Sequence, residues 1–182
     1  MNRRHLLTST TSVALVLLSA GLAGCASQQI TSYANEKPVL DLRSYLNGTL
    51  DAQGVFTDRS GTVVKRFTVL MQCSWQGDEG VLDEAFTYSD GTTQRRIWRL
   101  TQLPDGRYTG RADDVVGEAQ GQTRGNAFYW TYTMSLPVDG RVIEVNFDDW
   151  MYLMTDKVML NKATMSKFGV RLGEVTLSFT KR

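Results

Sequence analysis

The residues that could carry out chemistry in this chain of 182 residues are few, and histidine is nearly absent from them. The one histidine, His5, lies close to the N-terminus. Without an imidazole in the rest of the chain, Ser-His-Asp and Cys-His nucleophilic sites, histidine-ligated metals and histidine general bases are all excluded there. Acid–base chemistry beyond residue 5 therefore depends on carboxylates.

The carboxylates include two adjacent pairs, Asp113-Asp114 and Asp148-Asp149. Neighbouring residues of a strand point to opposite faces, so neither pair automatically forms a catalytic dyad. Glu84 with Asp149 is a third combination. The acidic clusters lack the spacing of a calcium loop, and the glycines lack the pattern of a phosphate loop. We expect no metal and no cofactor, and the sequence favours a protein that is not an enzyme.

The first residues have the order of a secretory signal peptide. Arg3 and Arg4 precede an apolar run from Val13 to Leu18, which small residues follow. The run is shorter than the roughly 20 residues that a membrane-spanning helix needs. We therefore expect residues 1–24 to be removed as a leader.

Cys25 ends the sequence Leu-Ala-Gly-Cys, which resembles the bacterial lipobox. The resemblance implies that the Cys25 thiol carries a lipid and that the protein is held on a membrane by several acyl chains. Position 26 is alanine rather than aspartate, which by similarity to Gram-negative sorting rules implies the periplasmic face of the outer membrane. Lipidation would leave Cys73 without a partner in the chain.

Cys73 alternates with Phe67, Val69, Met71 and Trp75, so we expect a buried and inert thiol. Removing the two arginines of the leader from the 20 basic residues leaves 18 against 19 acidic residues, a formal charge of −1. A nearly neutral domain provides no electrostatic attraction for nucleic acid. We expect no nucleic-acid partner.

After the leader, the chain divides into a tether and one domain. Residues 25–37 are mostly polar and are expected to link the lipid to the domain. Residues 38–182 form the domain, which begins with a short helix within 38–47, where Leu42, Tyr45 and Leu46 have helical spacing and Gly48 is a stop signal. From Thr49 onward the apolar period becomes two and turn signals recur at intervals typical of strands.

Turn positions set which residues face each other in the predicted strands. The turn at Pro104-Asp105-Gly106 pairs Leu103 with Arg107 and places Arg96 opposite Asp114. A loop at 89–91 pairs Glu84 with Arg96 and Leu82 with Trp98. The carboxylates Glu84 and Asp114 would then flank Arg96 on the inner face of the sheet.

The segments 128–136 and 141–151 form a hairpin with one apolar face. A loop of 137–140 sets Trp130 opposite Phe147. Continued by twos, the face of Phe128 also includes Arg124 and Asp149. About eight to ten such strands suit closure into a barrel, which can just enclose a small ligand. The predicted fold is an all-β, antiparallel, lipocalin-like barrel with one short N-terminal helix, and a β-sandwich is the alternative.

Four segments together resemble one known family: residues 147–153 (FDDWMYL), 110–117 (GRADDVVG), 74–77 (SWQG) and 167–170 (KFGV). They are similar to the proteobacterial lipoproteins catalogued as domain of unknown function 3833, over nearly all of the chain from about residue 45. The resemblance implies a location in the cell envelope and a calycin-like barrel. The family has no established activity and no catalytic residues that the resemblance could carry over to this chain.

Two functions remain open. In the first, the barrel binds a lipid or another hydrophobic small molecule, with inward charges that orient a head group. The residues expected to line that site are Glu84, Arg96, Trp98, Asp114, Arg124, Phe128, Trp130, Tyr132 and Asp149. The alternative for the same residues is a packed core in which the charges pair and close one end of the barrel.

The second function is docking of an envelope partner through a surface patch. In the predicted register Trp150 and Tyr152 face outward, and exposed aromatic side chains mark contact sites. A helix that covers this strand would be the structural alternative.

Overall fold

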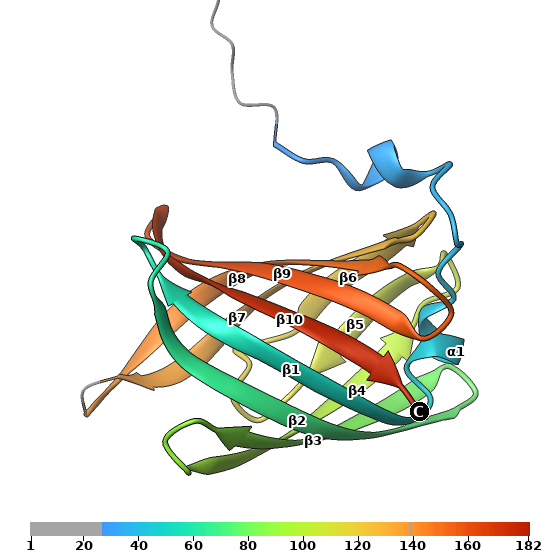
Figure 1. The fold of residues 1–182 in the computed structure, drawn as a ribbon. Coiled ribbons are helices and arrows are strands. Elements are labelled where there is room, and N and C mark those ends of the chain that lie inside the picture. The colour runs from blue at the N-terminus through green and yellow to red at the C-terminus, as the bar shows by residue number, and fades with distance from the viewer. Residues whose placement is uncertain (1–26, 139) are drawn as a thin grey trace, which may run out of the picture.

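The computed structural model describes residues 27–138 and 140–182, which form a barrel with the N-terminal segment lying along its outside (Figure 1). The predicted leader, the lipobox and the lipidation site Cys25 lie outside the described residues. Leader cleavage and lipid attachment therefore stay predictions. No helix in the described part of the chain is long and apolar enough to cross a membrane.

Ten antiparallel strands close the barrel. They are β1 (Gly48–Asp58), β2 (Val63–Gln76), β3 (Glu79–Tyr88), β4 (Thr93–Gln102), β5 (Arg107–Arg111), β6 (Ala119–Arg124), β7 (Ala127–Val138), β8 (Arg141–Leu153), β9 (Val158–Lys167) and β10 (Val170–Lys181). Each strand pairs with its neighbours in sequence, and β10 pairs with β1, which leaves no open sheet edge. The predicted barrel is confirmed, and the sandwich alternative is wrong.

The inner face follows the alternation of the sequence. In β2, Phe67, Val69, Met71 and Cys73 are buried, and the residues between them are exposed. Cys73 is a buried free thiol, as predicted. Burial raises the pKa of this thiol to about 12, which keeps it protonated and unreactive near neutral pH.

A short helix fills the end of the barrel at which β1 begins. It is α1 (Leu42–Tyr45), whose first turn is capped by Asp41 accepting from the Ser44 amide at 3.2 Å. Leu42, Tyr45 and Leu46 are all buried, and the indole Nε1 of Trp75 donates to the Leu46 carbonyl at 2.7 Å. The helix predicted within 38–47 is therefore confirmed.

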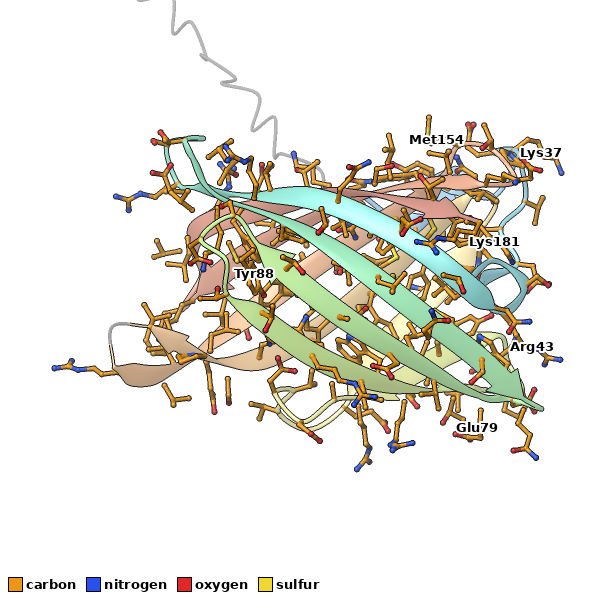
Figure 2. All side chains as sticks on the ribbon, turned by 60° about the horizontal axis from the view of Figure 1, so that its bottom comes forward. Lys37, Arg43, Glu79, Tyr88, Met154 and Lys181 are labelled. Carbon is orange, nitrogen blue, oxygen red and sulfur yellow. The ribbon has the colours of Figure 1, made fainter. Side chains whose placement is uncertain are left out.

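Among the described residues, the other end of the barrel is formed by hairpin turns and by the longer loop 112–118 between β5 and β6, which bridges to β7 through Val115 and Met134. Figure 2 marks the two ends: Tyr88 lies at the end without a helix, and Arg43, Glu79 and Lys181 lie at the end with α1. A molecule entering the barrel along its axis would meet buried side chains of α1 at one end and loops at the other.

The hairpin of β7 and β8 differs from its predicted register by two residues. Trp130 pairs with Asp149, and Tyr132 pairs with Phe147. The predicted loop was too long, since the two strands continue to Val138 and Arg141. A shift of two residues preserves the side-chain faces, so the predicted apolar face is still the inner one.

The segment predicted as a polar tether is partly folded. Residues Ile30–Tyr33 form a 3-10 helix, η1, and Ile30 is buried against Ala127 and Trp150 on the outside of the barrel. The Leu40 amide donates to the Gly125 carbonyl at 2.8 Å. From Ile30 onward the chain is therefore part of the domain, because the Ile30 side chain packs on the aromatic surface around Trp150.

Candidate functional site

The barrel encloses a cavity of about 210 Å³. Its wall is mostly apolar and aromatic, with side chains from nearly every strand. The lining residues that sequence reasoning named are Glu84, Arg96, Trp98, Phe128, Trp130, Tyr132 and Asp149. The structure also adds a ring of phenylalanines from β1, β2 and β3, namely Phe56, Phe67 and Phe86. The inward aromatic side chains therefore line a cavity and do not only pack against one another.

Four aromatic rings pack together along β4, β7 and β8. The ring of Trp98 meets Trp130 and Tyr132 edge-on, with centroids 5.5 and 5.3 Å apart. Tyr132 stacks on Phe147 at 4.9 Å. Such contacts stabilise the wall by about 1 kcal/mol for each pair beyond simple burial. The rings are thus held in fixed positions around the cavity.

Glycines in the two adjacent strands, β5 and β6, make room for the Trp130 ring. A Cβ atom at Gly110 would lie 2.6 Å from the Trp130 ring, and one at Gly121 would also overlap it. Gly121 on β6 pairs directly with Trp130 on β7. The indole therefore lies flat against bare backbone, and only glycine is compatible with this approach.

Arg96 and Asp114 form the main ion pair of the interior. The guanidinium donates from Nε and Nη2 to the Asp114 carboxylate, with Nη2 to Oδ2 at 2.8 Å. Both side chains are largely buried, at 16% and 23% exposed. A bidentate pair of this kind fixes the guanidinium plane, so Asp114 determines where Arg96 points.

Glu84 faces Arg96 from β3, as predicted, but at a longer distance. Its Oε2 lies 3.9 Å from Arg96 Nη1, and it accepts no hydrogen bond from the described residues. Burial raises the pKa of Glu84 to about 7, and the attraction of Arg96 offsets only part of that increase. Glu84 is therefore a cavity carboxyl with unused acceptor capacity.

Asp149 is better satisfied. The Tyr132 hydroxyl donates to its Oδ2 at 3.0 Å, and the Asn161 amide donates to its Oδ1. Burial raises the pKa of Asp149 to about 6, against the lowering effect of these two hydrogen bonds. The same burial raises the pKa of Tyr132 well above its usual value. This trio forms a second polar spot in an otherwise apolar wall.

The adjacent carboxylate pairs divide between two faces of the sheet. Asp148 lies outside, where it accepts from the Tyr129 hydroxyl, while Asp149 lies inside. Asp113 is exposed, and its neighbour Asp114 turns to Arg96. Among the described residues, no three His, Cys, Asp or Glu side chains are grouped so that they could hold a metal ion.

Two predicted cavity positions differ in the structure. Asp114 does not line the cavity itself but holds Arg96, which does. Arg124 was predicted to point inward, and this is wrong: it is exposed, and its Nη1 donates to the Thr123 carbonyl. The hairpin turn uses two residues, so Thr123 pairs with Phe128 and shares its inner face, and Arg124 falls on the outer one.

The outer aromatics are also different from expectation. Trp150 and Tyr152 face outward, but the expectation that Trp150 is exposed is wrong, because η1 covers it to 9% exposure. The Trp150 ring lies 4.4 Å from the ring of Tyr129 and 5.8 Å from that of Tyr33. Tyr152 is half-buried. The covering helix, named as the structural alternative, is the arrangement found.

Asn161 is the cavity residue that sequence reasoning missed. It is one of two buried polar residues among those described, the other being Asp149, to which it donates. It alternates with Met159 and Ala163 on the inner face of β9. A polar residue within an apolar alternating set was the signal that could have identified it.

Comparisons with known proteins agree with this fold. The model of the family described as "Protein of unknown function (DUF3833)" matches residues 19–181. An S-type phycobiliprotein lyase from Guillardia theta superposes with a TM-score of 0.59 at 6% identity, covering 85% of this chain and 97% of the lyase. At that identity the likeness shows the fold alone.

A designed fluorescence-activating β-barrel superposes with a TM-score of 0.43 at 13% identity, over 79% of this chain and 99% of the design. No curated protein matches the chain in sequence.

Proposed function

The chain belongs to the family of proteins of unknown function DUF3833, and from that premise we propose that it is a binding protein for a hydrophobic or amphipathic small molecule. The observation that carries this proposal is the cavity of about 210 Å³ inside the barrel, with aromatic walls and two polar spots. Pockets of this composition bind ligands through apolar contact and use a few polar groups to orient them.

The size of the cavity supports occupancy. An engineered apolar cavity of about 150 Å³ stays dry and binds benzene, and the present cavity is larger. Its polar wall groups also argue against a purely structural interior. Burying several ionisable groups costs free energy unless all are paired, and Glu84 has no hydrogen bond from the described residues.

The proposal includes a location in the cell envelope. Its support is the predicted leader and the lipobox that ends at Cys25, which lie before the described residues. The lipid would hold the barrel on the periplasmic face of the outer membrane. Metabolic labelling with a radioactive fatty acid tests this part, and a Cys25→Ser protein that incorporated as much label as the wild type would exclude Cys25 as the site.

A second candidate function, docking of an envelope protein, is favoured by exposed apolar side chains at the end of the barrel that lacks a helix. Phe168 is 90% exposed and Val142 is 72% exposed, and Val138 and Val170 lie in the same two hairpins. Exposed apolar groups on neighbouring loops mark contact sites. Crosslinking in intact envelopes should lose its products in the Phe168→Ser protein and keep them in Leu160→Ser, which alters an exposed residue near the other end of β9.

The main test fills the cavity from one side. Ala163 lines it from β9, so Ala163→Leu should remove space, while Ala85→Leu adds the same atoms on the exposed outer face of β3. Native mass spectrometry and solvent extraction of the protein from its own envelope should find a bound small molecule in the wild type and in Ala85→Leu. Loss of that molecule in Ala163→Leu supports binding in the barrel. An empty wild-type protein that also fails to bind added small amphiphiles would refute the proposal.

A further inference from the structure

We infer that the ligand of this barrel is an amphipathic amine, with one apolar chain or ring and one ammonium group that binds beside Glu84. The inference rests on the proposed function, since it specifies the head group of a molecule held in the same cavity. Its basis is the balance of charges and hydrogen bonds on the cavity wall rather than the acidic residues taken alone.

The charged groups around the cavity are mostly acidic. Glu84 and Asp149 line the cavity, and Asp114 stands directly behind Arg96. Arg96 is the one basic residue among the described residues of the lining. Once these carboxyls are ionised, they outnumber the cations around the cavity, and a ligand that brought a further negative charge would increase the imbalance. A positive head group would reduce it.

Arg96 is already paired with Asp114. Its Nε and Nη2 bind Asp114 in a bidentate pair, and its guanidinium carbon lies 5.3 Å from the centre of the Phe86 ring. The Nη1 group donates no hydrogen bond to the described residues, but the Arg96 charge is already neutralised by Asp114, so a carboxylate or phosphate head would add an uncompensated negative charge beside Glu84. Among the described residues, the wall thus has no cation whose charge is not already balanced by a carboxylate.

The Glu84 carboxyl can accept hydrogen bonds from a ligand. Among the described residues, the one basic group within 4.0 Å of it is Arg96 Nη1 at 3.9 Å, beyond hydrogen-bond distance. The Asp149 oxygens, in contrast, each have a donor, from Tyr132 and Asn161. An ammonium group has three N–H donors and fits a carboxylate without needing the guanidinium.

Aromatic side chains line the cavity on the strand that carries Glu84 and on nearby strands. Phe86 and Tyr88 lie on the same strand as Glu84, and all three line the cavity together with Trp98 and Tyr132. Aromatic faces attract a cation, most strongly where water is excluded. An ammonium group therefore gains contacts here that a neutral hydroxyl of the same size does not, and a carboxylate would be repelled.

The test compares three ligands that share one chain: octylamine, octanol and octanoate. Each is titrated into the purified protein at pH 8, where both Glu84 and the amine are charged, below its micelle or solubility limit, and binding is followed by calorimetry. We expect octylamine to bind at least about tenfold more tightly than octanol, as a charge-assisted hydrogen bond predicts, and octanoate to bind most weakly. Octanol or octanoate binding as tightly as octylamine would overturn the amine inference while leaving the proposed function intact.

Variants place the head group. Glu84→Gln removes the charge but keeps the side-chain shape, and Asp114 still pairs with Arg96. We expect this variant to lose about tenfold in octylamine affinity and to change octanol affinity by less than about threefold. Glu144→Gln, on the exposed outer face of β8, is the matched control and should bind all three compounds as the wild type does.

The outcomes separate the two proposals. If none of the three compounds binds wild-type protein, the proposed function fails, and the amine inference fails with it. If octylamine binds equally to the Glu84→Gln and wild-type proteins, the head group is not beside Glu84 and the inference alone is wrong. Thermal unfolding of both variants is measured alongside, to check that the barrel is folded in each binding experiment.

Discussion

Replacing Glu84 by glutamine should change how the stability of the barrel depends on pH. Burial raises the pKa of Glu84 in the folded protein from 4.5 to about 7. Below pH 4.5 the carboxyl is protonated in both the folded and the unfolded chain. Between pH 4.5 and 7 the unfolded chain ionises while the folded chain keeps its proton, so the free energy of unfolding falls as pH rises. Above pH 7 the full loss is present.

The size of this loss follows from the pKa difference. One pKa unit corresponds to about 1.4 kcal/mol, so a shift from 4.5 to about 7 costs the folded protein about 3 kcal/mol at pH 8. Glutamine has no charge to desolvate and avoids this cost. The stability difference between Glu84→Gln and wild type should therefore move by about 3 kcal/mol in favour of the variant between pH 4 and pH 8.

Urea unfolding followed by tryptophan fluorescence at each pH measures this difference without a ligand. Glu144→Gln, which changes an exposed glutamate on β8, is measured alongside as the matched control. A Glu84→Gln difference that stayed constant within about 0.5 kcal/mol would refute the reasoning. It would mean that Glu84 is solvated or paired in the folded protein more completely than its contacts indicate.

Three further outcomes follow from contacts in the structure. Arg96→Met should lower the free energy of unfolding by about 3–5 kcal/mol, because Asp114 and Glu84 lose their common cation, and urea unfolding at pH 8 measures this. Gly121→Ala should lower it by about 1–3 kcal/mol, since a methyl group there overlaps the Trp130 ring, whereas Gln120→Ala on the outer face of β6 should have little effect in thermal unfolding. Trp150→Ala should release η1 and make residues 27–36 sensitive to limited proteolysis, and an N-terminal segment as resistant as in wild type would contradict this packing.

Much of the interior could be predicted because turns fix strand register. The short turn at Asp105-Gly106 brings Leu103 to Arg107 and directs Asp114 toward Arg96, and both contacts are found. The pairing of Glu84 with Arg96 was predicted in the same way. Where the sequence indicates how many residues a turn contains, the alternation of side chains correctly predicts which residues of both strands face inward.

The failures arise where the chain gives no turn length or no periodicity. Arg124 was placed inside by counting in twos through a turn, but a two-residue turn changes the parity of the count. The covering of Trp150 depends on Ile30, a lone apolar residue with no repeating pattern around it. Such long-range packing becomes visible only when the barrel has brought β8 next to the N-terminal segment.

The Trp130 ring packs directly against Gly110 and Gly121. The volume of the cavity therefore depends on two residues that do not line it. A single methyl group added at either glycine would overlap the indole, so the indole would have to shift. Substitution at these two glycines would thus narrow the range of molecules admitted without altering Glu84 or Arg96. Proteins with the same polar groups in the cavity could therefore differ in the size of the ligand that they bind. Residues 110 and 121 are the positions at which we expect such a difference.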